Sequence, residues 1–208
     1  KAYLEFYETI EKEMKTRRLN KSDRFVLHLG FKWELSDSVK RALTTYTWYP
    51  SLSVKNTMKR LSTILDPIQH GTPLDLAKGV IGLASRRIPP QDILYLEVSE
   101  EGNPRKSFDV NVYRANLQLG ELYPFFVDMC RHYSIPLEQF QTLYDPVKNQ
   151  VFGHLSGGVD REERDFLTVY YGVEGIGDLN AASVLPPQKS LLGARSRSRT
   201  PSRNKPSF

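Results

Sequence analysis

Three stretches of the sequence each carry a tyrosine two positions after a small polar residue. These pairs are Thr44 and Tyr46, Asn111 and Tyr113, and Thr168 and Tyr170. Residues two apart in a β-strand point to the same side of a sheet, so each pair is expected to share one face. Tyrosine hydroxyls can donate hydrogen bonds to anionic oxygens, and tyrosine rings attract cations. Three such pairs would suit a ligand that is anionic at one end and becomes cationic during a reaction.

Other polar residues lie at positions that predict the same orientation. They are His28, Lys32, Tyr95, Glu97 and His154, all within or near predicted strands. A histidine or a carboxylate facing the same ligand could remove a proton from it. We therefore predict Glu97 and His154 as catalytic groups, although a hydrogen-bonded structural histidine or a solvated glutamate would fit the same positions. Neither a pair of histidines at metal-ligand spacing nor a DDxxD motif occurs, so we expect no metal site.

The elements that must position these residues recur along the chain. Alternating apolar residues predict three hairpins, and helical spacing predicts a pair of helices between successive hairpins. The predicted strands span residues 24–34, 41–49, 93–99, 107–114, 151–156 and 165–173. The predicted helices span residues 1–18, 53–65, 72–88, 121–133 and 136–143.

This ββ-αα-ββ-αα-ββ order indicates an α+β fold built from repeats. The equivalent tyrosines Tyr46, Tyr113 and Tyr170 are 67 and then 57 residues apart. We expect antiparallel strands with helices on one face only, and a curved sheet whose other face surrounds a polar lumen.

The alternation of helix pairs and hairpins resembles the ABBA aromatic prenyltransferases of the dimethylallyltryptophan synthase type. The segment GHLSGGVDREERDFLTVYYG (Gly153 to Gly172) is similar to the last hairpin of that family, and TTYTWYP (Thr44 to Pro50) is similar to its basic-x-Tyr strand. The resemblance covers roughly residues 20 to 174. It implies a barrel with helices outside, in which an allyl group passes from an allyl diphosphate to an aromatic, indole-type acceptor without a requirement for magnesium or another cofactor.

The resemblance also implies roles for particular residues. Tyr46, Tyr113 and Tyr170 would shield the allyl cation and bind the diphosphate. The preceding positions, where the family has basic residues, are Thr44, Asn111 and Thr168 here, and they can bind a diphosphate but cannot neutralise its charge. Lys32 and His28 are the further substrate-binding candidates.

The number of repeats also departs from the family. Three hairpins give six strands, whereas the family barrel has ten. Either further repeats precede Lys1, or a second chain completes the barrel by self-association, or the fold is a smaller open form.

Composition divides the chain into three parts. Residues 1–174 form the predicted repeat domain, 175–194 a linker, and 195–208 a Ser/Arg-rich tail that we expect to be disordered. The tail holds five basic residues and no acid, which accounts for the whole net charge of +5. A single cysteine excludes an internal disulfide, and no apolar run is long enough to span a membrane. We expect a cytoplasmic protein without a membrane partner.

Two other functions remain open at this point. One is a non-catalytic ligand-binding or scaffold domain of the same fold, which the neutral Thr44, Asn111 and Thr168 favour. The other is nucleic-acid binding through the basic tail, which the neutral body of the chain disfavours. Within the prenyltransferase interpretation, the acceptor could be an indole, an aromatic amino acid, a phenol or a peptide.

Overall fold

The protein contains one antiparallel sheet in which the strands follow one another in chain order. The computed structural model describes residues 2–16, 18–20, 22–34 and 37–172. The seven strands are β1 (Ala2–Glu5), β2 (Phe25–Glu34), β3 (Asp37–Trp48), β4 (Leu94–Glu100), β5 (Asn103–Asn111), β6 (Phe152–Val159) and β7 (Asp165–Tyr171). Because β1 and β7 are the two edges, the described sheet is open rather than a closed barrel.

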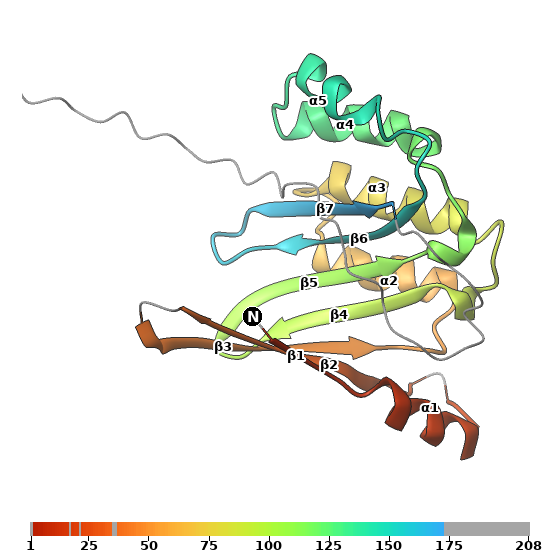
Figure 1. Ribbon diagram of the computed structural model, residues 1–208, viewed down its shortest axis with the longest axis vertical. Coiled ribbons are helices and arrows are strands. Elements are labelled where there is room, and N and C mark those ends of the chain that lie inside the picture. The colour runs from red at the N-terminus through yellow and green to blue at the C-terminus, as the bar shows by residue number, and fades with distance from the viewer. Residues whose placement is uncertain (1, 17, 21, 35–36, 173–208) are drawn as a thin grey trace, which may run out of the picture.

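In the described part of the chain, the α-helices pack on this sheet or on one another. The helices are α1 (Tyr7–Thr16), α2 (Val54–Ile64), α3 (Gly71–Ala84), α4 (Tyr123–His132) and α5 (Leu137–Tyr144). Three short 3-10 helices are η1 (Pro90–Asp92), η2 (Tyr113–Ala115) and η3 (Leu119–Leu122). Here α2 and α3 pack on one face of the sheet, α4 packs on α3, and α5 packs on α4. Helices α2 and α3 cover one side of the sheet, α4 and α5 lie beyond the edge strand β7, and α1 lies apart from them beside β1 to β3 (Figure 1).

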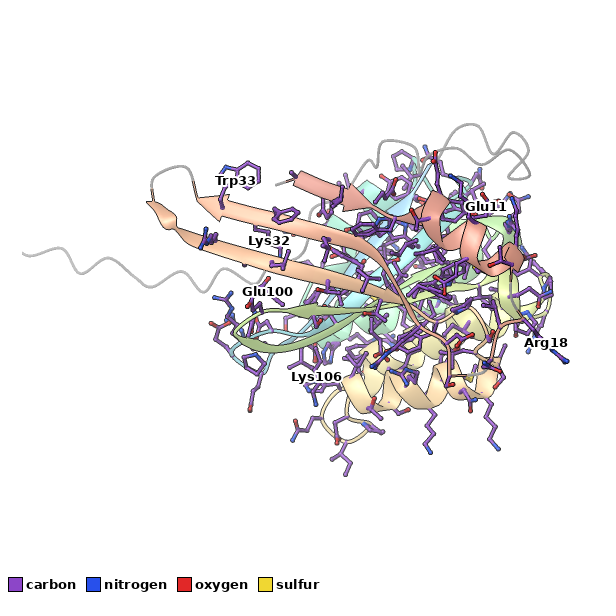
Figure 2. All side chains as sticks on the ribbon, turned by 90° about the horizontal axis from the view of Figure 1, so that it is seen from below. Glu11, Arg18, Lys32, Trp33, Glu100 and Lys106 are labelled. Carbon is purple, nitrogen blue, oxygen red and sulfur yellow. The ribbon has the colours of Figure 1, made fainter. Side chains whose placement is uncertain are left out.

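The β2–β3 hairpin is the longest in the sheet and extends beyond the helical layer. Lys32 and Trp33 point to opposite sides of this hairpin, as expected for consecutive strand residues (Figure 2). Trp33 is half exposed, whereas Lys32 lies between the hairpin and the end of β4 near Glu100.

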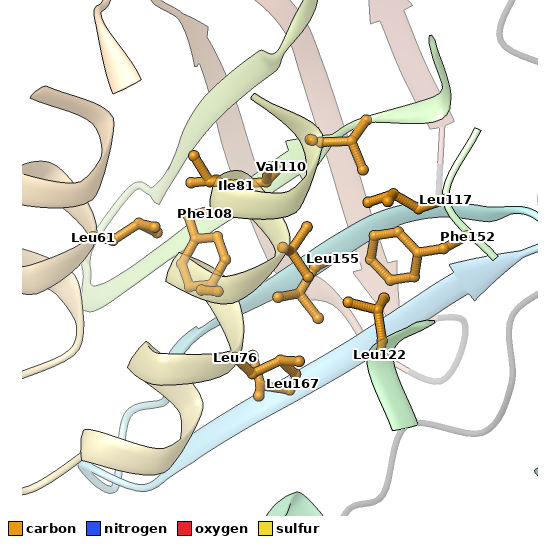
Figure 3. Packing of buried hydrophobic residues seen from close by; sticks show 14 of the residues in the cluster. Leu61, Leu76, Ile81, Phe108, Val110, Leu117, Leu122, Phe152, Leu155 and Leu167 are labelled. Atoms are coloured by element: carbon orange, nitrogen blue, oxygen red, sulfur yellow. The ribbon is translucent and has the colours of Figure 1, made fainter. Parts of the chain in front are cut away.

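The main hydrophobic core fills the space between the sheet and α2, α3 and α4. Phe108, Val110 and Leu155 are completely or almost completely buried on the sheet side, and Leu76 and Ile81 of α3 are buried against them (Figure 3). Burial of each large apolar side chain contributes about 1.5–3 kcal/mol. This core therefore fixes the side of the sheet on which each strand residue points.

A second, smaller core lies on the opposite face of the sheet under α1. Ile10 of α1 is buried with Phe25, Leu27 and Leu96 from the strands. The neighbouring residue Tyr95 points into the main core, so the two cores use alternate positions of β4.

Most of the elements expected from the sequence are confirmed, and the α+β class with antiparallel hairpins is as predicted. Three expectations are wrong. The first helix begins only at Tyr7, after an additional strand β1 that pairs with β2. Helices are not confined to one face, because α1 packs on the other. Residues 157–159, expected in a loop, continue β6.

The position of Tyr113 also differs from the prediction. It lies in η2 and not in a strand, because β5 ends at Asn111. The side chain of Asn111 accepts a hydrogen bond from the Tyr113 N–H at 3.2 Å, and Asn116 adopts a left-handed conformation that closes the turn. Asparagine favours both features, which explains the early end of the strand. The predicted linker and tail lie outside the described residues.

Candidate functional site

Two histidine–tyrosine pairs lie on the face of the sheet opposite α2 and α3. His28 of β2 is directly opposite Tyr46 of β3, and His154 of β6 is directly opposite Tyr170 of β7. In each hairpin the register shifts just before the histidine. With Asp109 of β5, these four residues define what we call the tyrosine face.

The rings around His154 are closely packed. The centroids of the His154 and Tyr170 rings are 4.0 Å apart, and the Tyr113 ring meets His154 edge-on at 5.8 Å. Gly153 makes this approach possible, since a Cβ at that position would collide with the Tyr113 ring. Although Tyr113 lies outside the strand, its side chain reaches the tyrosine face as predicted.

Asp109 is the acidic group beside His154 on this face. Its Oδ2 atom accepts a hydrogen bond from the Ser156 hydroxyl and lies 3.6 Å from Nε2 of His154. Burial lowers the pKa of His28, and Asp109 is close enough to oppose this lowering although His28 belongs to a strand three positions away in the sheet. Asp109 is therefore near both histidine–tyrosine pairs.

The sheet curls toward the tyrosine face. Six strand spacings separate β1 from β7, which would place them about 29 Å apart on a flat sheet. Burial and the charge of Asp109 raise the pKa of Tyr170 on β7, and Tyr3 on β1 is nevertheless near enough to add a smaller electrostatic contribution. An electrostatic influence over 29 Å would be lost to screening, so the two edges approach one another across this face.

The protonation of the site follows from burial. Burial lowers the pKa of His154 and of His28, and it outweighs the opposite influence of Asp109 on His154 and of Glu5 and Asp109 on His28. Burial, followed by the charges of Asp109 and Tyr170, raises the pKa of Tyr113 to about 12. Burial also raises the pKa of Tyr170. At neutral pH the histidines are thus bases and the tyrosines are hydrogen-bond donors.

The β1 side of the face is more exposed. Glu5 lies 3.3 Å from Nδ1 of His28, and the Tyr3 ring meets the Tyr46 ring at 6.1 Å. Tyr3 is 58% exposed, whereas His154 on the other side of the face is 3% exposed. The site is therefore open toward β1 and closed toward β6.

Ion pairs join three hairpins at one rim of this face. The buried carboxylate of Glu100 accepts hydrogen bonds at 2.6 Å from both Lys32 and Arg161 (Figure 2). Thr44 is 3.5 Å from the same carboxylate. Lys32, which was predicted to bind substrate, thus forms an ion pair with Glu100.

The predicted sharing of one face is confirmed for most of the candidate residues. The register places these side chains on the tyrosine face: His28, Lys32, Thr44, Tyr46, Asn111, His154, Thr168 and Tyr170. Alternation in the strands was sufficient to predict their orientation.

The orientation predicted for Glu97 and Tyr95 is wrong. Both point toward the helices, where Glu97 forms hydrogen bonds with Arg60 of α2 and Tyr95 is buried in the main core. The alternate residues Leu94 and Leu96 instead face α1. The prediction failed because it assigned the apolar side of β4 to a single helical layer, whereas α1 provides a second one.

Sequence reasoning did not identify Asp109 as a site residue. Its position was available from alternation, because Asp109 lies two residues before Asn111 on the same strand. Its proximity to His28 depends on the curl of the sheet, which the local sequence does not encode.

Comparison with known proteins gives no family for the chain. No protein-family model, no curated protein and no solved structure matches it. Within the described residues, no cluster of three or more acidic, histidine or cysteine side chains could hold a metal ion. The helices of this part of the chain also lack the length and apolar character that a membrane span requires.

Proposed function

We propose that the tyrosine face transfers an allyl group from an allyl diphosphate to an aromatic acceptor. The observation that carries the proposal is the position of Asp109 beside His154, whose ring contacts the rings of Tyr113 and Tyr170. Ring faces and a carboxylate both stabilise a cation, and they do so most strongly where water is excluded. The same arrangement would stabilise an allyl cation.

The tyrosines have two roles in this proposal. Because burial raises the pKa of Tyr113 and Tyr170, their hydroxyls stay protonated and can donate hydrogen bonds to the diphosphate oxygens. Their rings line the closed side of the face and keep water from the cation. The more exposed side near Tyr3 would admit the aromatic acceptor.

The reaction balances without a further reactant. The C–O bond of the allyl diphosphate breaks, and diphosphate leaves with the electron pair. A carbon of the acceptor ring then forms a bond to the allyl cation, and the proton on that carbon is removed. We assign the removal of this proton to His154, which is neutral at pH 7 because burial lowers its pKa. Glu97 is unsuitable because its side chain lies on the helix side of the sheet.

A non-catalytic ligand-binding domain is the second candidate. Thr44, Asn111 and Thr168 provide no positive charge, and Lys32 is paired with Glu100. A diphosphate would depend on neutral donors unless Lys32 exchanged its partner, and neutral hydrogen bonds are roughly half as strong as charge-assisted ones. This observation favours binding of a less charged molecule at the same face.

The test is to incubate the protein with dimethylallyl diphosphate and a panel of aromatic acceptors, including tryptophan, tyrosine and short peptides that contain them. Mass spectrometry would detect the added allyl group, and thermal unfolding would report binding. We expect a product with the wild type and its loss in Asp109→Asn and Tyr170→Phe, whereas Tyr7→Phe, an exposed tyrosine of α1, should behave as wild type.

The two candidates give different results. Stabilisation by dimethylallyl diphosphate without any product would favour the ligand-binding domain. A product that is unaffected by Asp109→Asn and Tyr170→Phe, or neither binding nor product, would contradict transfer at the tyrosine face.

A further inference from the structure

A separate groove lies on the other face of the sheet, between α2 and strands β3 to β5. Its volume is about 730 Å³, within the range of small-molecule sites. Four basic side chains and one carboxylate line it: Arg24, Lys59, Arg60, Lys106 and Glu97. Figure 2 shows Lys106 on the helix side of the sheet, away from the tyrosine face.

Several contacts fix the position of Arg60 in this groove. Its Nε and Nη2 atoms donate hydrogen bonds to the two oxygens of Glu97 at 2.6 and 2.7 Å, and Nη2 also donates to the Tyr49 hydroxyl at 2.8 Å. The guanidinium group lies 4.1 Å from the centroid of the Tyr49 ring. In the described part of the chain Nη1 has no hydrogen-bond partner, so one edge of the fixed guanidinium remains available.

Glu97 is fully engaged by these contacts. It also accepts hydrogen bonds at 3.0 Å from the hydroxyls of Tyr49 and Tyr95. Burial opposes ionisation, but the hydrogen bonds from Arg60 and the two tyrosines outweigh it and lower the pKa of Glu97. The carboxylate therefore neutralises Arg60 and no other cation of the groove.

The remaining three cations leave the groove strongly positive. Among the described residues, Arg24, Lys59 and Lys106 form no ion pair, although all three border the same space. Burial and Glu97 raise the pKa of the Tyr49 hydroxyl, and Arg24 is near enough for its charge to oppose this rise. Cations gathered around one cleft raise the local concentration of anions.

The rest of the lining is suited to a phosphate ester. Hydroxyl groups of Thr47 and Ser99 provide neutral donors, and Leu52 and Ile64 provide an apolar wall. We propose that this groove binds an organic phosphate, with the phosphate between Lys59, Lys106 and the free edge of Arg60 and the organic group against the apolar wall. This site is independent of prenyl transfer at the tyrosine face.

The probe is phenyl phosphate, titrated into the full chain by isothermal calorimetry, with inorganic phosphate in a parallel titration. We expect binding that weakens about tenfold or more in the double variant Lys59→Gln/Lys106→Gln, because two charge-assisted contacts are lost. The matched control is Lys12→Gln/Lys55→Gln, which removes two exposed lysines outside the groove and should leave the affinity unchanged.

Phenyl phosphate should bind more tightly than inorganic phosphate because of the apolar wall. Equal loss of affinity in both double variants would indicate a general charge effect and overturn the proposal. So would an unchanged affinity in the groove variant, or equal binding of both phosphates. Loss of binding in Asp109→Asn would place the ligand on the tyrosine face instead, and would equally overturn the proposal.

Discussion

Glu100 should stabilise the protein chiefly through its charge. Its side chain is 5% exposed and accepts hydrogen bonds from Lys32, Arg161 and Asn103. Burial alone would raise the pKa of Glu100, but these hydrogen bonds outweigh it and lower the pKa from 4.5 to about 2. This difference corresponds to about 3 kcal/mol of folding free energy.

The sign of the pH dependence follows from the lowered pKa. The contribution is fully present above the pKa of the unfolded chain, near 4.5, and is lost as the pH falls toward 2. Glu100→Gln keeps the shape of the side chain and removes its charge. We expect the variant to be less stable than wild type by about 3 kcal/mol at pH 7 and by only about 1.4 kcal/mol at pH 3.

Urea unfolding at several pH values, followed by circular dichroism, measures this difference. Arg161→Gln is the control, since the Arg161 side chain is 64% exposed and its pair with Glu100 should contribute less than about 1 kcal/mol. A loss in Glu100→Gln that is the same at pH 7 and pH 3 would refute the reasoning, because it would show that packing and not charge is responsible.

Three further substitutions test the packing of the sheet against the helices, each measured by urea or thermal unfolding. Asp165→Asn should destabilise the protein by about 1–3 kcal/mol, because the Asp165 carboxylate lies 2.9 Å from His132 of α4 and 3.0 Å from His70, just before α3. A variant as stable as wild type would argue against this link between the helices and β7. Gly158→Ala should destabilise the protein strongly, because Gly158 has a φ of +151° and a Cβ there would collide with the backbone carbonyl of Lys106 in β5. A stable variant would mean that the backbone of β5 and β6 can shift. Leu155→Ala should lower the free energy of unfolding by about 2–5 kcal/mol, whereas Leu143→Ala should lower it far less because Leu143 is more than half exposed. Equal losses in the two variants would contradict the placement of the core.

The elements of the fold could be predicted from local sequence patterns. Alternation located the hairpins and placed Tyr46 and Tyr170 on one face, because the period of a strand is fixed by backbone geometry. Helical spacing located α2, whose predicted first residue, Ser53, is the N-cap and accepts a hydrogen bond from the Asn56 N–H at 3.3 Å. These features depend only on neighbours in the chain.

The errors concern features that depend on distant parts of the chain. The side on which Glu97 points was misjudged because the pattern of β4 allows either face to be the apolar one, and only the position of α1 decides between them. The role of Asp109 also depends on the curl of the sheet, which brings β5 near β2. The spacing of apolar residues within one strand or helix predicts neither the packing of α1 nor the curvature of the sheet.

The most direct test of the central claim is whether the tyrosine face binds a cation next to diphosphate. Dimethylallylammonium resembles the allyl cation in size and charge, and its binding can be measured by calorimetry with and without inorganic diphosphate. The account predicts that each ligand strengthens the binding of the other, and that Asp109→Asn abolishes the binding of the ammonium ion. An ammonium affinity that is undetectable, or that is unchanged in Asp109→Asn, would contradict the account.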